Sequence, residues 1–488
     1  MSHSIPSAST SGAAPSANSP KWIVPGAVAF ALACGAVGFG IAKSGQKGGN
    51  DAVAAPPAAS ASATPVAADE FSAEAVLDAI PDPGSATAAA KEVIRWRDRA
   101  KARPEIGQLW VNTGDALMQL AREKVDPHDV VPAEKCYKRA LSLNEKDPGA
   151  TIGMAWIAGS RHQFPLSIEW AEKGIALMPR DNRSHGLIGD AYVELGEYDK
   201  AFDAYQKMLD IRPDITSYSR GAHLLYLTGD TRKAFFLMAS AINAGTADGE
   251  DSAWCRAQLG EMLFETGALL PAETALKTAM KLKPNNYFVL TAMGKVQSAR
   301  GNTKEAIALL EKAVAVSPQH AALAALYENY VAAGRTADAE KTFTAIETAA
   351  QHHKTHGNAD SFYLARFYAD AGKKLPEALA IVQSKTETPN PVDADTAAWV
   401  YYKNGKYAEA KKYIDIALKK IAPDAARLYH AGMIYEKADS PFEARKYLGR
   451  AINKNPQFSP VHAPLAIATR RELGTLSPQN VAKRAATK

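Results

Sequence analysis

The chain has 488 residues, 22% of them charged, and a formal net charge of +5, so it is long enough for several domains or one extended array, and its charge excess is slight. Its three cysteines, Cys34, Cys136 and Cys255, lie far apart without CxxC or Cys/His spacing, which indicates neither a disulfide framework nor a zinc motif. The sequence contains no GxxxxGK(S/T), HExxH or GxSxG motif and no GxGxxG after a strand, so nothing in it indicates an enzyme or a cofactor.

The N-terminal residues predict a membrane anchor. Residues 1–21 are rich in Ser, Ala and Pro and cannot bury a core, so we expect a disordered tail. Residues 22–42 carry no charge and lie between Lys21 and Lys43. At about 1.5 Å per residue they would span roughly the 30 Å hydrocarbon core of a bilayer, which predicts a single transmembrane helix. A buried core helix is the weaker interpretation, because the flanks offer no domain to bury it.

A second interpretation of this segment is a lipoprotein signal. The stretch ALAC ending at Cys34 loosely resembles a bacterial lipobox, in which case Cys34 would carry a lipid and the chain would be a lipoprotein-anchored adaptor. The extreme N-terminus has no basic residue, however, and the apolar run continues beyond Cys34 where a lipoprotein would become polar. Either interpretation leaves the rest of the chain at a membrane.

Residues 43–70 form an Ala/Pro/Ser-rich linker that we expect to be semi-extended, because proline blocks helix and sheet. A spacer of this composition is typical of an extracytoplasmic domain held off a membrane. The lysines near the span lean weakly the other way, with Lys21 before it and Lys43 and Lys47 after it. We favour a single-pass membrane protein with a periplasmic or extracytoplasmic C-terminal part.

From about residue 107 the sequence repeats with a period of 34 residues. Equivalent small residues and prolines one period apart are Pro179 and Pro213, Gly260 and Gly294, Gly267 and Gly301, Ala272 and Ala306, Pro284 and Pro318, and Ala410 and Ala444. A fixed period of this length predicts a solenoid.

One period reads as a helical hairpin. Ile188, Gly189 and Tyr192 share one face of a first helix, and Gly196 permits a tight turn. A second helix follows, with its inner face formed by Ala201, Tyr205 and Met208, and Pro213 ends it. The small residues fall where the two helices approach most closely, because a large side chain there would force the axes apart.

This pattern resembles the tetratricopeptide repeat. Residues 253–286, 287–320 and 425–458 match it closely, and residues 391–424 nearly as well; the first of these units carries Leu259, Gly260, Leu263, Gly267, Ala272, Leu276, Ala279 and Pro284. The resemblance implies an all-α fold, a right-handed α-solenoid of about ten helical hairpins over residues 107–458. Because each hairpin leaves an apolar face bare, we expect N-terminal capping helices in 71–106 and a C-terminal capping helix and tail in 459–488.

In this family the first helix of each hairpin lines a concave groove, through positions 2, 5, 9, 12 and 13 of the unit. The resemblance therefore implies a partner-binding groove formed by Trp156, Asp190, His223, Tyr226, Trp254, Glu261, Phe264, Arg366, Trp399 and Tyr402. Aromatic and Arg side chains are typical binding anchors, although each ring is as well explained by packing against the next hairpin. The charges at the groove positions alternate in sign, so the groove does not indicate a nucleic-acid partner.

Two more specific sites are not supported. The carboxylate clamp of co-chaperone repeats needs Lys, Asn and Arg at fixed positions, where this chain has Val111, Asp115, Gly186 and Asp190. The stretch QHHKTHG, residues 351–357, has a histidine pair at i, i+4, but without an acidic or Cys neighbour it does not predict a metal site.

We therefore expect a membrane-anchored scaffold that binds protein or peptide segments during assembly of an envelope complex. An accessory factor that presents a client in cytochrome c maturation, or in polysaccharide or pilus export, is the alternative. No residue selects between them, and the partner stays unidentified.

Overall fold

The computed structural model describes residues 71–84, 87–124, 130–246, 249–355, 362–384, 390–420, 422 and 424–474. The chain divides into two units, Met1–Glu70 and Phe71–Lys488, and all described residues belong to the second. The predicted tail, membrane span and linker lie outside the described residues, as do Cys34 and His356. No helix in the described part has both the length and the apolar character needed to cross a membrane.

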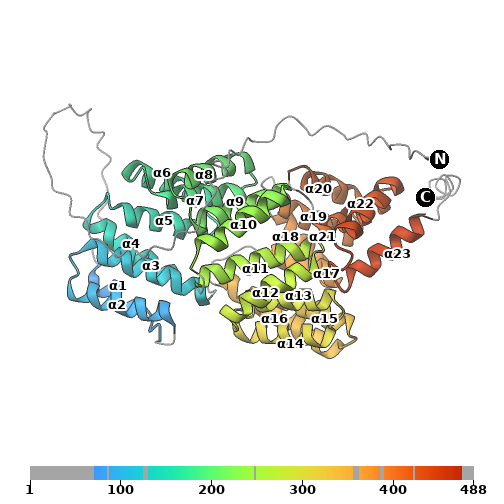
Figure 1. Cartoon of the computed structure of the whole chain (residues 1–488), viewed down its shortest axis with the longest axis horizontal. Coiled ribbons are helices and arrows are strands. Elements are labelled where there is room, and N and C mark those ends of the chain that lie inside the picture. Colours follow the sequence, from blue (N-terminus) through green and yellow to red (C-terminus); the bar gives the residue numbers. More distant parts are fainter. Residues whose placement is uncertain are drawn as a thin grey trace, which may run out of the picture. The chain divides into compact units, whose positions relative to one another are not determined.

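The described residues form 23 helices and no strand, which confirms the predicted all-α class for this part of the chain (Figure 1). In chain order the helices are α1 (Ala73–Asp78), α2 (Ala88–Ala102), α3 (Gly107–Lys124), α4 (Val130–Leu143), α5 (Pro148–Ser160), α6 (Phe164–Leu177), α7 (Asn182–Glu194), α8 (Tyr198–Ile211), α9 (Ile215–Thr228), α10 (Thr231–Ala244), α11 (Glu250–Glu265), α12 (Leu269–Leu282), α13 (Tyr287–Ala299), α14 (Thr303–Val316), α15 (His320–Ala332), α16 (Thr336–Thr355), α17 (Phe362–Ala371), α18 (Leu375–Ser384), α19 (Pro391–Lys403), α20 (Tyr407–Lys420), α21 (Ala425–Lys437), α22 (Pro441–Lys454) and α23 (His462–Gly474).

From α3 to α22 these helices pack as ten successive pairs, and each pair contacts the next, as in an α-solenoid. The odd-numbered first helix of a pair is called here the inner helix and the even-numbered one the outer helix. Helices α1 and α2 pack before the first pair, and α23 packs on α21 and α22 after the last.

In several pairs a glycine of the inner helix faces a large residue of the outer helix. A Cβ added at Gly260 would lie 2.5 Å from Leu276 Cγ, and one at Gly189 would lie 2.2 Å from Tyr205 Cε1. Because both distances are far below van der Waals contact, only glycine permits this approach. The predicted hairpin register is confirmed at these positions.

The turn between the two helices of a pair requires a left-handed residue. Gly196 adopts φ 71°, as the tight turn predicted there requires, and glycines take the corresponding place in most later pairs. In the second and tenth pairs the residues with positive φ are His162 and Asp439.

The array curves so that its C-terminal pairs lie against the third, fourth and fifth pairs, which the repeat pattern does not predict. Figure 1 shows α19 and α21 beside α9 and α10. Three hydrogen bonds, called here the closing contacts, join the two regions. Asn390 Nδ2 donates to Glu194 O at 3.2 Å, Ala422 N to Leu227 O at 2.8 Å, and Asn455 Nδ2 to Phe264 O at 2.8 Å.

The acceptors of the closing contacts are carbonyl groups in the last turns of α7, α9 and α11, where no helical N–H follows to bond them. Phe264 O also accepts a hydrogen bond from Gly267 N at 2.9 Å. The turns next to these contacts contain glycines, because a side chain there would collide with the C-terminal pairs. A Cβ at Gly229 would lie 2.9 Å from Ala422 Cβ, and one at Gly267 would lie 2.8 Å from Lys454 O. The curvature is therefore fixed by specific contacts between pairs that are distant in sequence.

Candidate partner-binding channel

Three adjoining cavities follow the inner helices from α9 to α19. The first, the Tyr226 chamber, has a volume of about 160 Å³; the second, the Lys295 chamber, about 290 Å³; and the third, the Tyr363 chamber, about 480 Å³. Glu265 and Asp424 line both of the first two chambers, and Ala324 and Glu328 line both of the last two. We call the three chambers together the inner channel.

The ninth residue of the repeat unit supplies one channel wall. Five successive inner helices, α9, α11, α13, α15 and α17, each contribute that residue, and the set is His223, Glu261, Lys295, Glu328 and Arg366. The opposite wall comes from the C-terminal pairs and α23, through residues such as Asp424, Arg427, Lys454 and His462.

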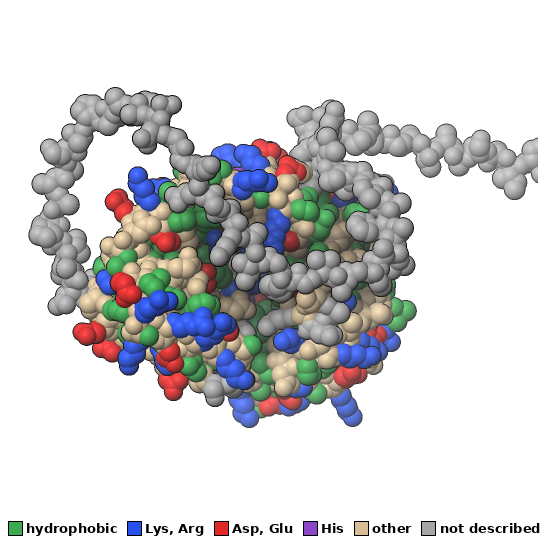
Figure 2. Space-filling view, turned by 60° about the vertical axis from the view of Figure 1, so that its left-hand side comes forward, with side chains coloured by type: hydrophobic (Ala, Val, Ile, Leu, Met, Phe, Trp, Pro, Cys, Tyr) green, Lys and Arg blue, Asp and Glu red, His purple; other side chains and the backbone are tan. Residues whose placement is uncertain are grey.

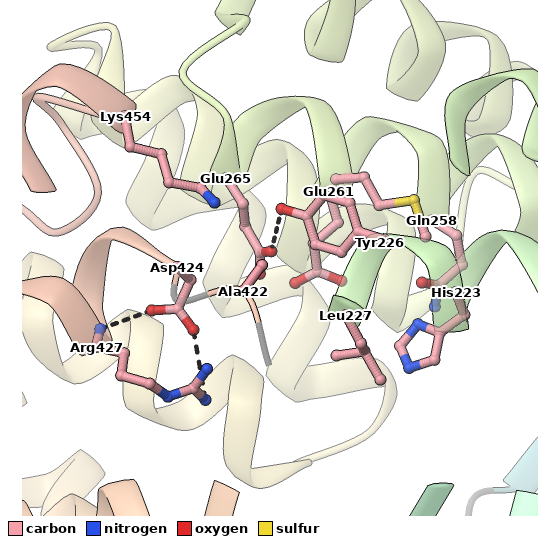
Figure 3. A pocket seen from close by; sticks show the side chains of 11 residues that line it. His223, Tyr226, Leu227, Gln258, Glu261, Glu265, Ala422, Asp424, Arg427 and Lys454 are labelled. Atoms are coloured by element: carbon pink, nitrogen blue, oxygen red, sulfur yellow. Dashed lines mark hydrogen bonds and ion pairs between the residues drawn. The ribbon is translucent and has the colours of Figure 1, made fainter. Parts of the chain in front are cut away.

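In the Tyr226 chamber the partly buried carboxyl group of Glu265 lies among groups of both signs (Figure 3). Tyr226 Oη donates a hydrogen bond to Glu265 Oε2 at 2.8 Å, and Lys454 reaches toward Glu265 from the other wall. Burial, together with the charges of Glu261 and Asp424, raises the pKa of Glu265 to about 7. Glu265 therefore changes its charge near neutral pH.

In the Lys295 chamber the ammonium group of Lys295 lies 2.9 Å from Glu261 Oε1. Glu328, at the far end of this chamber, accepts a hydrogen bond from Ser459 Oγ at 3.1 Å. Burial and the nearby Asp370 raise the pKa of Glu328 to about 7, although Ser459, Arg366 and Lys295 act in the opposite direction. The side chain of Glu328 is nevertheless 28% accessible, because it faces a cavity.

The Tyr363 chamber has aromatic walls, formed by Tyr327, Phe362, Tyr363 and Phe367. The ring of Tyr363 stacks on that of His320 with centroids 4.6 Å apart. Arg366 reaches this chamber, and its guanidinium group contacts Asp370 Oδ2 at 3.0 Å and Asp395 Oδ2 at 2.9 Å.

Behind the Tyr363 chamber, a buried polar network holds α17, α19 and α21 together. Trp399 Nε1 donates to Asp370 Oδ1 at 2.8 Å, and its ring stacks on His430 with centroids 4.3 Å apart. His430 Nδ1 lies 3.0 Å from Asp395 Oδ1. Burial alone would raise the pKa of Asp395, but His430 and Arg366 hold it well below its usual value. The carboxylate is therefore charged and compensated inside the fold.

Five of the ten predicted groove residues line the inner channel. These are His223, Tyr226 and Glu261 in the Tyr226 chamber, Phe264 in the Lys295 chamber and Arg366 in the Tyr363 chamber. Whether they contact a partner stays a prediction.

The other five predicted groove residues lie elsewhere. Asp190 is paired with Arg220 at 2.8 Å, and Trp156 is half-buried with Arg122 over its ring. Trp254 is 42% exposed, whereas Trp399 is only 1% exposed and Tyr402 stacks on it with centroids 4.8 Å apart. Of these four aromatic residues Trp254 is the most exposed, Trp156 and Tyr402 are half-buried, and Trp399 belongs to the packed interior.

Sequence reasoning missed two kinds of channel residue. The predicted groove does not include Lys295 and Glu328, although both are ninth residues of their units and the repeat register alone identifies them. The residues of the opposite wall, such as Asp424 and Lys454, carry no such signal, because they reach the channel only through the curvature of the array.

Tetratricopeptide repeat models match residues 183–215, 298–357 and 396–460. The chain therefore contains tetratricopeptide repeats, and no catalytic family is indicated by these matches. No curated protein matches the sequence.

Several solved structures resemble parts of the chain. The human IFIT1 dimer with PPP-AAAA is 14% identical with a TM-score of 0.41, covering 79% of this chain and 95% of its own. YrrB, described as a TPR protein with an unusual peptide-binding site, is 19% identical with a TM-score of 0.27. The match covers 38% of this chain and 95% of YrrB. MamA is 16% identical with a TM-score of 0.28, and the match covers 35% of this chain and 92% of MamA.

Proposed function

We propose that this chain is a membrane-anchored scaffold whose inner channel binds an extended segment of a partner protein. The observation that carries this proposal is the alignment of five ninth-position side chains along adjoining cavities. An extended segment lying along them would meet a different side chain at each helix pair, which is how a repeat array reads a peptide. The tetratricopeptide repeats support a role in protein binding.

The proposed anchor is residues 22–42, and residues 43–70 would act as a spacer between the membrane and the array. In this arrangement the array is extracytoplasmic and holds its partner beside the membrane while an envelope complex assembles. The uncharged run and the Ala/Pro/Ser composition support this part of the proposal.

Site-specific photo-cross-linking tests the binding surface. A photo-reactive residue replaces Ser298, which lines the Lys295 chamber, in the full-length chain made in its own cells. The matched control replaces Lys304, an exposed residue of the outer helix α14. We expect one discrete adduct from position 298 and none from position 304. The same adduct from both positions, or none from position 298, would contradict the proposal.

A further inference from the structure

The Tyr363 chamber has the size of a site for one large side chain and its flanking backbone. Its volume of about 480 Å³ falls in the range of pockets that enclose small ligands. The aromatic rings from α15 and α17 supply flat apolar walls that can receive an aliphatic chain or the face of a cation.

The charged groups that line this chamber are predominantly acidic. The guanidinium group of Arg366 is the one arginine or lysine group among its lining residues, and it is already matched by Asp370 and Asp395. Glu328 and Asp393 add two more carboxyl groups to the lining. The side chain of His462, also in the lining, has its pKa lowered to about 4, chiefly by burial, and is neutral at physiological pH. A ligand that brings its own positive charge would balance the site.

From this geometry we infer that the Tyr363 chamber binds a lysine or arginine side chain of the partner segment. The aliphatic stem lies against the aromatic walls and the cationic head lies beside Glu328. This inference rests on the proposed function, and it specifies which residue of the partner the channel selects.

A carboxylate or an apolar group fits less well. An acidic side chain would meet Glu328 and Asp393, and the one guanidinium group it could contact is held by two carboxylates. An apolar side chain would fill the aromatic part of the chamber but would bring no positive charge to balance its carboxyl groups. Peptides with an apolar or an acidic side chain are therefore the contrasting probes for this site.

Glu328 gives the inference a pH signature. The charged and polar groups that face it are Asp370 and Arg366 from α17, Lys295 from α13, and Ser459 and His462 near α23. With a pKa near 7, Glu328 is ionised at pH 8 and mostly protonated at pH 6. Because a bound cation favours the ionised form, binding at pH 6 must release a proton, and the affinity falls by up to about tenfold.

The test uses four terminally blocked pentapeptides, Ala-Ala-Xaa-Ala-Ala, with lysine, arginine, norleucine or glutamate at Xaa. Calorimetric titration into the full-length chain in mild detergent should give lysine and arginine probes about tenfold tighter than norleucine at pH 8, with glutamate weakest. Glu328→Gln should remove the preference and its pH dependence. The control Glu305→Gln, at an exposed site on α14, should leave both unchanged.

Equal binding of the norleucine and lysine probes, or an unchanged preference in Glu328→Gln, would overturn the inference. Failure of every probe to bind would overturn it as well. The proposed function is judged separately, because an adduct at position 298 supports partner binding in the channel whatever side chain the Tyr363 chamber prefers.

Discussion

Single residues in this array serve two separable purposes, packing between helices and lining of the inner channel. Trp399 and Trp254 illustrate the difference, since they occupy inner helices of the same kind of unit but are 1% and 42% exposed. Trp399→Ala should lower the free energy of unfolding by about 3 to 5 kcal/mol, because it empties a buried site and removes one of the two donors that Asp370 has in Trp399 and Arg366. Trp254→Ala should leave stability nearly unchanged. Denaturant unfolding measures both, and equal losses would contradict the assignment.

If Trp254 is an anchor for the partner, Trp254→Ala should weaken binding by about 2 kcal/mol while the fold stays intact. Titration with the partner that cross-linking identifies measures this effect. Binding unchanged in this variant would remove Trp254 from the partner-binding surface without affecting the assignment of the inner channel.

Gly260 tests the close packing inside a pair. Gly260→Leu should lower the free energy of unfolding by about 1 to 3 kcal/mol, because the new side chain would overlap Leu276. Gly474→Leu is the control, since a Cβ there meets nothing within 4 Å. Thermal melting compares the two variants, and similar melting temperatures would show that this contact does not limit the approach of the helices.

The partly buried carboxyl group of Glu265 predicts a pH dependence of stability. Its pKa is about 7 in the fold, above the usual value for glutamate, so the folded state binds more protons than the unfolded state. Its contribution to stability is full below about pH 4 and is lost as the pH rises through about 7. Relative to the native chain, Glu265→Gln should therefore gain stability at pH 8 compared with pH 4. Urea titrations at the two pH values test this, and an unchanged difference would contradict it.

At the scale of elements, the closing contacts decide how the array curves. Gly267→Ala and Gly301→Ala form a matched pair, because both positions have φ near 80° but only Gly267 faces the C-terminal pairs. Gly301→Ala should cost about 1 to 2 kcal/mol for the left-handed backbone alone. Gly267→Ala should cost more and should speed proteolysis between the tenth pair and α23. Identical effects of the two substitutions would mean that the closing contacts do not hold the array.

The helix pairs could be predicted from the sequence because each depends on contacts within one 34-residue period. Gly260 and Leu276 are 16 residues apart, so a pattern of small and large residues records their contact. The closing contact between Asn455 and Phe264 leaves no such pattern, because the two residues are separated by 191 positions. The channel wall formed by the inner helices could therefore be predicted from the repeat register. The opposite wall, which contains Asp424 and Lys454, could not.

At the scale of the whole molecule, the face drawn in Figure 2 does not favour a partner of one charge. Figure 2 shows Lys, Arg, Asp and Glu side chains scattered over the visible described face. The charged groups of the inner channel are likewise of both signs, with Lys295 and Arg366 between acidic groups. We expect selection of the partner to occur in the chambers rather than through the net charge of +5.

Membrane attachment is a further prediction for the whole chain. Deletion of residues 22–42 should move the protein from the membrane pellet to the supernatant after sedimentation. A reporter that is active only outside the cytoplasm, fused after Lys488, should be active in the full-length chain. Activity of a cytoplasmic reporter at the same place would reverse the proposed orientation.

Hydrogen exchange of the full-length chain, alone and with the partner cross-linked at position 298, tests the central claim most directly. The account predicts added protection in peptides from the inner helices α11, α13, α15 and α17, which line the chambers. Peptides from the outer helices α12, α14 and α16 should exchange as before. Protection confined to these outer helices would show that the partner binds the other face of the array, and that the inner channel is not its binding site.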